Sequence, residues 1–473
     1  MKLRLRNSLC WQRYSRNSTV HGIKYLVDDD LHPAERIFWF ILLALAVFGT
    51  VNVSLLLSRR FSSSPLATVI ESTIYPVSEI PYPAVTICTS NRINWSHVDD
   101  AVGQYAASVG GNLANMTVTL KYFLAEGIER MLSDEFDLVR NFPQNNHQSH
   151  RELEHINFGQ LLHEISPRCS NIFKEPCWWR NKYVNCCTIF VHQVTTYGHC
   201  FAFNALYNEE AARHLNETDW PWRTSNYGDW SGLRVTLRNP QARGIGVIIH
   251  HPIEWPQTAK FIPTGSIAIF SITPTFSYSS SSVGRFTPTQ RGCLLESEIS
   301  DEETVMSLPG LKYHLENCIA ECRQRYMVQY CNCTVDFMYP TGSYPICNAT
   351  GLRCIGNFVG KWRKYTVLQP HIHTPKDTTL CATCLPQCRH VTYSIATESN
   401  TLPAEDRDLI TLDIHFRYAT MVKYRTYVVY EFLDLIVAFG GIAGLFLGSS
   451  LLSIVEILYY ILCGIFRANN IPS

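Results

Sequence analysis

The side chains that could do chemistry inside a membrane lie in one apolar segment of this chain, residues 439–460. The segment reads FGGIAGLFLGSSLLSIVEILYY and holds four glycines, three serines and one glutamate. A plain membrane anchor needs none of these residues. A charged group at the centre of a span costs about 2.5–3.5 kcal/mol on insertion scales, so such groups usually face water or a partner. Glu456 is therefore the residue that most clearly indicates a function.

Small and acidic side chains share one face of this segment if it forms a continuous helix. At about 100° per residue, Asp434, Gly441, Gly448, Leu452 and Glu456 fall within about 40° of one line. If two or more copies of the chain packed along this line, the carboxylates would border an aqueous path that favours cations. Backbone carbonyls or hydroxyls of residues 448–450 would narrow that path. The pattern predicts a cation pore.

The same glycines allow a purely structural alternative. Gly440, Gly444 and Gly448 repeat as G-x-x-x-G-x-x-x-G, a pattern that lets membrane helices pack closely. In that case the chain would be a receptor or adhesion protein whose two spans form a hairpin. This alternative leaves Glu456 unexplained.

Two segments are apolar enough to cross a bilayer. Residues 37–57 carry no charge, and about 20 such residues suffice. Residues 435–466 are more than a span needs, so this segment should tilt, break or protrude. The long polar stretch before residue 37 predicts a retained signal anchor rather than a cleaved signal peptide. The expected parts are a cytoplasmic tail (1–36), a span (37–57), an extracellular domain (58–434), a span (435–466) and a cytoplasmic tail (467–473).

The segment between the spans has the composition of an extracellular domain. It contains 16 of the 18 cysteines, from Cys88 to Cys388. It also contains the glycosylation sequons, at Asn94, Asn115, Asn216, Asn332 and Asn348. These features predict a plasma-membrane protein with both termini in the cytoplasm. The 40 basic and 40 acidic residues balance, so bulk charge indicates no nucleic-acid partner.

Ten of these cysteines, from Cys293 to Cys388, are crowded enough to suggest zinc ligands. Outside the cell, however, thiols oxidise, and we expect disulfides that each contribute about 2–4 kcal/mol. Three histidine-containing pairs, His250-His251, His371-x-His373 and His163-Glu164, are interpreted as scattered surface residues. No catalytic motif is found, so we expect no enzyme, no bound metal and no cofactor.

Periodicity predicts a mixed α and β domain between the spans. Apolar residues recur loosely at helical spacing in residues 91–136 and 151–165. Alternating and β-branched residues in 232–249 and 265–273 predict strands.

Several motifs, in order along the chain, resemble one known family. They are residues 18–25 (STVHGIKY), 75–88 (YPVSEIPYPAVTIC), 197–204 (YGHCFAFN), 286–293 (FTPTQRGC), 321–333 (ECRQRYMVQYCNC), 384–388 (CLPQC) and 448–450 (GSS). Together they resemble the degenerin/epithelial sodium channel family, and within it the insect pickpocket branch. The match covers nearly the whole chain.

The resemblance implies a homo- or hetero-trimer with related subunits in the lipid bilayer. Each subunit would carry a large ectodomain likened to a hand, with palm, thumb, finger and β-ball. Family members conduct sodium ions without voltage gating and are commonly blocked by amiloride. The implied disulfides are Cys88–Cys200, Cys177–Cys186, Cys293–Cys388, Cys318–Cys384, Cys322–Cys381, Cys331–Cys354 and Cys333–Cys347. Cys169 and Cys187 have no counterpart and, because the number is even, could bridge each other.

The resemblance also assigns roles to residues near the membrane. Gly448, Ser449 and Ser450 would form the selectivity filter, where the second helix breaks. The pore-lining and amiloride region would include Glu431, Asp434, Gly441, Gly444 and Glu456. His21 and Gly22 would form a re-entrant gating loop. Val437, followed by Ala438, occupies a position where most members carry a small residue. Either the local alignment slips by one residue, or by steric argument Val437 biases the channel towards opening.

These features predict the pore-forming subunit of a sodium channel in a sensory or epithelial cell, opened by a chemical or mechanical stimulus that the sequence does not identify. The alternative is a non-conducting accessory subunit or receptor-like partner in a hetero-trimer, which would tolerate the same filter residues. An ATP-gated trimeric receptor is disfavoured, since its lysine-rich nucleotide site is not evident.

Overall fold

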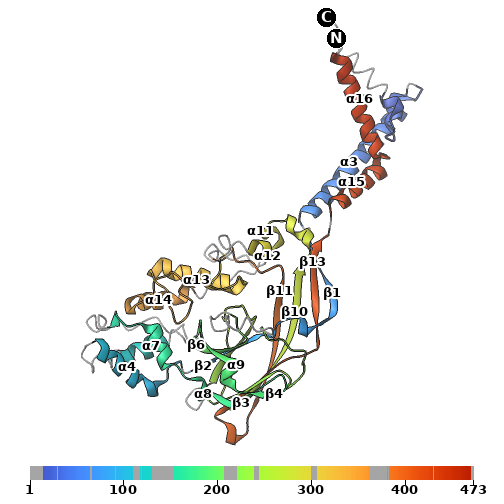
Figure 1. Cartoon of the computed structure of the whole chain (residues 1–473). Coiled ribbons are helices and arrows are strands. Elements are labelled where there is room, and N and C mark those ends of the chain that lie inside the picture. Colours follow the sequence, from blue (N-terminus) through green and yellow to red (C-terminus); the bar gives the residue numbers. More distant parts are fainter. Residues whose placement is uncertain are drawn as a thin grey trace. The chain divides into compact units, whose positions relative to one another are not determined.

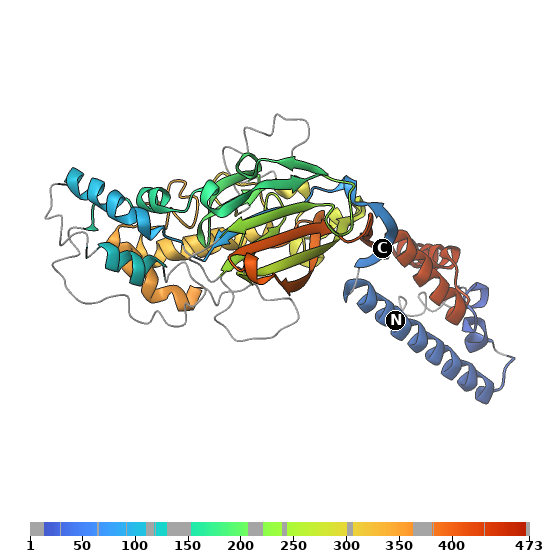
Figure 2. The same cartoon turned by 90° about the horizontal axis from the view of Figure 1, so that it is seen from below.

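The structure, a computed structural model, falls into two compact units (Figures 1 and 2). They are Met1–Thr68 with Thr426–Ser473, and Val69–Arg425. The described residues are 14–28, 30–63, 66–90, 92–109, 118, 120–129, 153–206, 221–238, 244–299, 306–362, 381, 383–429 and 431–469.

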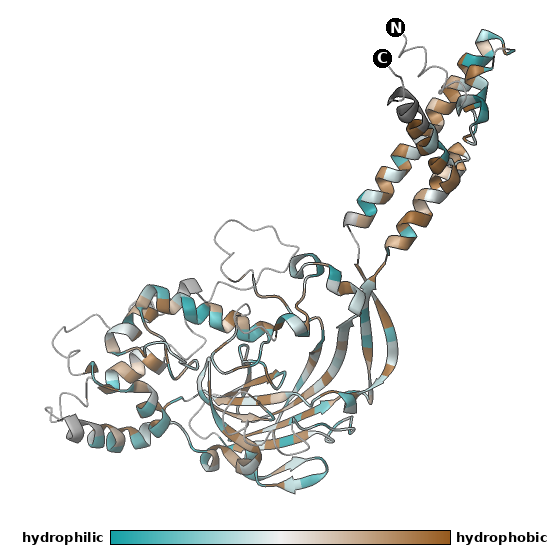
Figure 3. Cartoon of the chain, turned by 45° about the horizontal axis from the view of Figure 1, so that its top comes forward, coloured by the Kyte–Doolittle hydropathy of each residue, from teal (hydrophilic) through white to brown (hydrophobic). Residues whose placement is uncertain are grey.

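The first unit is mainly helical. Its helices include α2 (Ile23–Val27), α3 (Pro33–Ser63), α15 (Phe432–Leu447) and α16 (Leu451–Asn469). Pro33–Phe61 is long and apolar enough to cross a membrane. The α15 helix and residues Leu451–Leu462 of α16 meet that standard only when taken together, and they are bent by 77° at the break between them. Figure 3 shows the predominance of apolar residues along α3 and α15.

Aromatic rings pack between α3 and α15 and between α2 and α3. A Cβ added at Gly49 of α3 would lie 2.7 Å from the ring of Phe446 in α15, so only glycine lets that ring pack on the α3 backbone. The ring of Tyr25 in α2 stacks on Trp39 of α3, with centroids 4.4 Å apart. Gly49 thus serves the packing of α3 against α15.

The second unit contains two β-sheets. In the described residues the larger sheet has eight strands, in the order β1-β13-β10-β12-β7-β3-β4 with β11 paired to β10. Its strands are β1 (Leu66–Pro76), β3 (Phe173–Trp179), β4 (Lys182–Val184), β7 (Leu233–Arg238), β10 (Ser266–Ser279), β11 (His390–Thr401), β12 (Leu409–Phe416) and β13 (Thr420–Val428). The smaller sheet has the order β5-β6-β2-β8-β9. Its strands are β2 (Ala84–Thr89), β5 (Phe190–Thr195), β6 (Gly198–Phe203), β8 (Gly244–His250) and β9 (Lys260–Pro263).

The main core of this unit is shared by the two sheets. In β10, every second residue from Ser266 to Ile272 is buried, as alternation along a strand with one covered face requires. The buried cluster joins side chains of the larger sheet, such as Phe270 and Leu412, to side chains of the smaller sheet, such as Val85 and Phe203. The strands expected in residues 232–249 and 265–273 are confirmed.

Helices form a second core in the same unit. The α-helices are α4 (Trp95–Val109), α7 (Phe158–Ile165), α8 (Cys169–Ile172), α9 (Cys186–Ile189), α11 (Pro288–Arg291), α12 (Glu296–Ile299), α13 (Leu315–Cys331) and α14 (Ala349–Trp362). Shorter turns are the π-helical Phe123–Glu129 and the 3-10 segments Val77–Glu79, Ser281–Arg285 and Ala404–Asp406. Of the helices expected in residues 91–136 and 151–165, the described residues hold α4, the π-helical Phe123–Glu129 and α7, and residues 110–117, 119 and 130–152 lie outside the described residues. The expected mixed α and β domain is confirmed.

Disulfides link the cysteines of the second unit. Within the described residues they are Cys88–Cys200, Cys169–Cys187, Cys177–Cys186, Cys293–Cys388, Cys318–Cys384, Cys322–Cys381, Cys331–Cys354 and Cys333–Cys347. These are the pairs that the family resemblance implies, together with the pair that it leaves unassigned. The sulfur atoms are therefore bonded to one another rather than held as zinc ligands.

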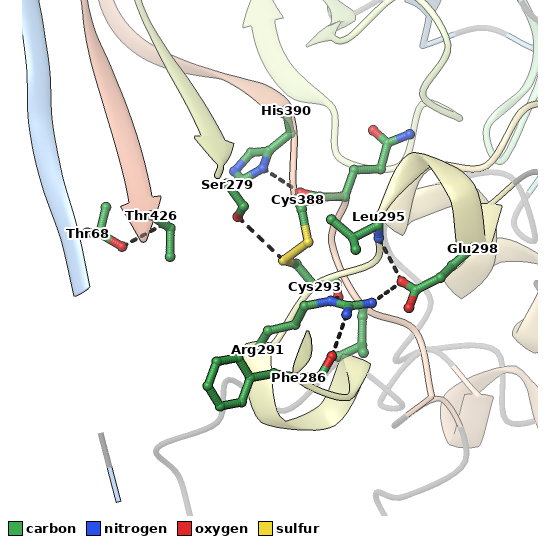
Figure 4. The surroundings of a disulfide bond; sticks show 12 residues. Thr68, Ser279, Phe286, Arg291, Cys293, Leu295, Glu298, Cys388, His390 and Thr426 are labelled. Carbon is green, nitrogen blue, oxygen red and sulfur yellow. Dashed lines mark hydrogen bonds and ion pairs between the residues drawn. A yellow bond between two sulfur atoms is a disulfide. The ribbon is translucent and has the colours of Figure 1, made fainter. Parts of the chain in front are cut away.

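The Cys293–Cys388 disulfide is surrounded by a buried arginine network (Figure 4). The guanidinium of Arg291 donates hydrogen bonds to the backbone oxygens of Phe286 (2.6 Å) and Cys293 (2.8 Å), and it forms an ion pair with Glu298. Five donors in one rigid fork allow Arg291 to bond several acceptors at once. The disulfide and this network fix the turn that follows α11.

We expect the Tyr82→Phe substitution to destabilise the second unit. The Tyr82 hydroxyl donates to the carbonyl of Ile414 (2.5 Å) and accepts from the amide of Leu233 (3.3 Å), where β12 pairs with β7. Tyr82 is fully buried, so two backbone groups lose their partner and the free energy of unfolding should fall by about 1–3 kcal/mol. The measurement is the denaturation midpoint of the purified chain. Tyr183→Phe, at a residue that is 68% exposed, is the control, and equal midpoints for the two variants would contradict the prediction.

Candidate functional site

The break between α15 and α16 is the centre of the candidate site. Gly448 ends α15 in the left-handed conformation (φ 62°), which glycine adopts without a steric penalty. Its amide donates to the carbonyl of Gly444 (2.9 Å), and the hydroxyl of Ser449 donates to the carbonyl of Ala443 (3.2 Å). These bonds satisfy carbonyls that a helix end would otherwise leave without a partner.

Ser450 and Ser453 then start the next helix. The amide of Ser453 donates to the carbonyl of Ser450 (3.0 Å), and the amide of Ser450 donates to the hydroxyl of Ser453 (3.0 Å). The second bond is one half of a capping box, with serine in place of the usual glutamate. Ser453 is buried, whereas Ser450 is exposed. The break is thus a defined structure with bonded backbone groups on both sides.

The segment before α2 docks onto this break. The amide of His21 donates to the carbonyl of Leu447 (3.0 Å), the last residue of α15. A Cβ added at Gly448 would lie 2.0 Å from Nδ1 of His21, so no side chain fits at residue 448 while His21 is in place. Gly22 follows in the left-handed conformation (φ 91°) and turns the chain into α2. The structure therefore brings His21 together with Gly448, two residues that the sequence analysis assigned to gating and filter.

Thr19 provides the partner that Glu456 requires. The Thr19 hydroxyl donates to the Glu456 carboxylate (2.7 Å), and its amide lies 3.2 Å from the same oxygen. The Thr19 hydroxyl also lies 2.8 Å from the hydroxyl of Ser453. Thr19 is not among the residues predicted from sequence, and its signal is its place two residues before His21 and Gly22.

The acidic residues at the start of α15 have a structural role. The Glu431 side chain accepts from the Asp434 amide, and the Asp434 side chain accepts from the Glu431 amide (2.9 Å), which forms a reciprocal capping box. Negative charge is also favourable at a helix N-terminus. Glu431 and Asp434 both remain exposed, so capping and an electrostatic role at a pore mouth are compatible.

The expected line of small and acidic residues along one continuous helix is wrong. Because the chain bends by 77° after Leu447, Glu456 in α16 does not share a helical face with Asp434 and Gly441 in α15. A periodicity argument assumes an unbroken helix, and the left-handed Gly448 removes that condition.

The glycines of α15 face open space within the chain. Among the described residues, none comes within 4 Å of a Cβ built at Gly440 or Gly441, and one at Gly444 meets only the Ser449 carbonyl at 3.7 Å. In the part of the chain that the structure describes, Gly440, Gly441 and Gly444 therefore do not pack against the first apolar helix in the way that the structural alternative requires. Val437 is likewise 65% exposed, and Ala438 is half-buried.

The structure also places the other residues singled out by sequence. His250 is not a surface histidine: it is buried, and its Nε2 lies 2.9 Å from the Thr86 hydroxyl. Of the sequon asparagines, Asn332 and Asn348 are exposed and Asn94 is half-buried. Asn115, Asn216, His371 and His373 lie outside the described residues.

The chain is similar in sequence to known ion-channel proteins. The family model described as "Amiloride-sensitive sodium channel" matches residues 14–460. Pickpocket protein 19 of Drosophila melanogaster is 24% identical, over 97% of this chain and 91% of that protein. Sodium channel protein Nach of the same fly is 24% identical, over 95% and 86%. Acid-sensing ion channel 1A of Danio rerio is 22% identical, over 95% and 87%.

These matches define a class of ion channels, not of enzymes. The chain belongs to the amiloride-sensitive sodium channel family, which is the degenerin/epithelial sodium channel family, and it is pickpocket-like. Members of this family form oligomeric channels that conduct sodium, and the family implies the plasma membrane.

We expect Gly448→Ala to weaken docking of the segment that holds His21. The substitution places a methyl group against the imidazole, and a left-handed alanine adds strain of about 1–2 kcal/mol. The measurement is disulfide formation between Thr19→Cys and Ser453→Cys, whose hydroxyls lie 2.8 Å apart in the unmodified chain. Cys10 and Cys463 are replaced by serine, and thiol labelling reports the reaction.

Cross-linking should fall about fivefold or more in the Gly448→Ala background, since about 1 kcal/mol already changes a population by that factor. Gly444→Ala is the matched control, because a Cβ there has ordinary contact distance. If both alanines reduced the cross-link equally, steric exclusion by His21 would not be the cause.

Proposed function

We propose that this chain is the pore-forming subunit of a voltage-independent sodium channel. The observation that carries the proposal is the break at residues 448–450, onto which the segment holding His21 docks. A broken helix within an apolar segment leaves backbone groups that lipid does not satisfy, so irregular backbone at membrane depth is tolerated only where it is buried in protein or lines water. Here the bonds from His21, Gly448 and Ser449 satisfy part of that demand.

In this proposal α3 is the first span and the bent pair of α15 and α16 is the second. The Val69–Arg425 unit would lie outside the cell, with both termini in the cytoplasm. Its disulfides and its exposed sequon residues, Asn332 and Asn348, support that side. The two sheets and the surrounding helices would correspond to the hand-like ectodomain of the family.

Three copies, identical or related, would enclose the path. The open faces of Gly440 and Gly441 leave room for a neighbouring helix to approach α15 closely. Gly448, Ser449 and Ser450 would line the narrowest part, where carbonyls and hydroxyls replace water around sodium. Amiloride would bind near Gly444, and Glu431 and Asp434 would raise the cation concentration at the outer mouth.

The direct test is voltage clamp of cells that express this chain alone. We expect an inward current that disappears when external sodium is replaced by a large organic cation and that amiloride reduces. Ser450→Ala should change the ratio of sodium to potassium permeability, because it removes an exposed hydroxyl from the proposed filter. An exposed serine of the second unit, Ser170, substituted to alanine is the control.

A silent cell with the chain shown at its surface would be tested next by co-expression with related chains. If Ser450→Ala left the permeability ratio of every such current unchanged, the filter assignment would be wrong. The chain would then be an accessory subunit.

We expect Val437→Gly to reduce resting current. Val437 is 65% exposed on α15, where its two methyl groups would meet the neighbouring copy in a closed assembly. Removing them should let the helices close, which lowers the open probability. The measurement is the amiloride-sensitive current at rest, normalised to surface protein, with exposed Leu433→Ala as the control for loss of apolar area. An unchanged resting current would contradict the steric argument.

A further inference from the structure

Three histidines from separate elements of the second unit come together. They are His163 of α7, His192 of β5 and His199 of β6, and one ring nitrogen of each lies within 4.8 Å of the others. Their ring centroids are 4.8 Å apart for His163 and His192, and 4.9 Å apart for His192 and His199. The ring nitrogens are thus close enough to converge on a single ion.

The strand register explains how two of these rings meet. In the β5–β6 hairpin, His192 is opposite Phe201 and His199 is opposite Val194. His192 and His199 are therefore diagonal neighbours on one face of the smaller sheet. The hydroxyl of Ser166, which follows α7, lies 2.8 Å from the His163 carbonyl and 3.4 Å from Nε2 of His192. It positions the end of α7 against β5.

Within the described part of the chain, the ring nitrogens of His199 lack the hydrogen-bond partners that buried polar atoms normally have. Among the described residues, neither of its ring nitrogens has a hydrogen-bond partner, although both atoms are buried. A buried nitrogen without a partner is unfavourable, and such an atom requires a reason. Burial, with a smaller effect of the neighbouring imidazoles, lowers the pKa of His192 to about 4 and that of His199 to about 3.

A cavity gives access to the cluster. It has a volume of about 670 Å³ and is lined by His163 and His192. Among its lining charges, the carboxylates of Asp100 and Glu164 outnumber the guanidinium of Arg168. An opening of this kind would admit a hydrated cation and leave one coordination position for water.

We propose that His163, His192 and His199 bind a divalent transition-metal ion, of which Zn²⁺ fits best. Zinc takes imidazole nitrogens at about 2.0–2.1 Å in tetrahedral geometry, which places ligand nitrogens about 3.4 Å from one another. The exposed His163 side chain can close the remaining distance by rotating about its own bonds. Calcium and magnesium are poor candidates, since they prefer oxygen ligands.

The bound ion would brace α7 against the β5–β6 hairpin. His199 directly precedes Cys200, which is joined to Cys88 of the central strand β2. Metal binding would thus stiffen the attachment of the helical core to the smaller sheet. This site does not depend on the proposed function, although the proposed topology exposes it to extracellular zinc.

The test is zinc binding to the purified full-length chain at neutral pH, after removal of metal by a chelator and without a histidine tag. We expect one Zn²⁺ per chain by elemental analysis, a higher denaturation midpoint with zinc, and no competition by excess Mg²⁺ or Ca²⁺. Co²⁺ should give the visible absorption of a tetrahedral site. Loss of an outer-shell partner alone weakens metal affinity about 10- to 100-fold, so His163→Ala should weaken binding at least about tenfold.

His163 is exposed, so its substitution should not prevent folding, and exposed His155→Ala is the matched control that should keep full affinity. His199→Gln provides a second variant at the buried nitrogen and should also lose zinc. If the unmodified chain retained no zinc, or if His163→Ala and His199→Gln bound zinc as tightly as His155→Ala, the proposal would be overturned. None of these outcomes depends on whether the chain conducts ions.

Discussion

The contact between His21 and Gly448 is the constraint on which the rest of the helical unit depends. An α-helix that stops within an apolar segment leaves carbonyls without donors, and lipid supplies none. The His21 amide supplies one donor, at the carbonyl of Leu447. It can do so only because Gly448 has no side chain and adopts the left-handed conformation. The break, the docked segment and the glycine therefore require one another.

The disulfide-bonded unit is organised by a different constraint. Its two sheets share one core, several of its helices pack in another, and strands β2 and β6 contribute side chains to both. Cysteine pairs such as Cys318–Cys384 and Cys322–Cys381 close chain separations of 66 and 59 residues around α13. Cross-links of this length restrict the unfolded chain strongly, in the entropic account of disulfide stabilisation. They tie both ends of the connection between these cysteines to α13.

Sequence predicted the parts of this protein that local pattern determines. Alternation in residues 265–273 gave β10, and the order of the cysteines within a resembled family implied pairs that the structure also joins. Contacts between distant residues were not accessible. Thr19 and Glu456 are separated by 437 positions, and no periodicity connects them. His192 and His199 meet His163 only because of a hairpin register and the docking of α7, which the spacing of histidines alone does not reveal.

The hydrogen bonds of Glu456 bear on where an ion would be selected. A carboxylate within an apolar segment was the first sign of function, yet one of its oxygens is already bonded to the Thr19 hydroxyl. A charge engaged in this way is stabilised by the protein and is less available to coordinate a passing cation. Ser450, by contrast, has an exposed side chain beside backbone of irregular geometry. On the proposed function, selection therefore belongs at residues 448–450, and Glu456 serves to hold the N-terminal segment that keeps those residues in place.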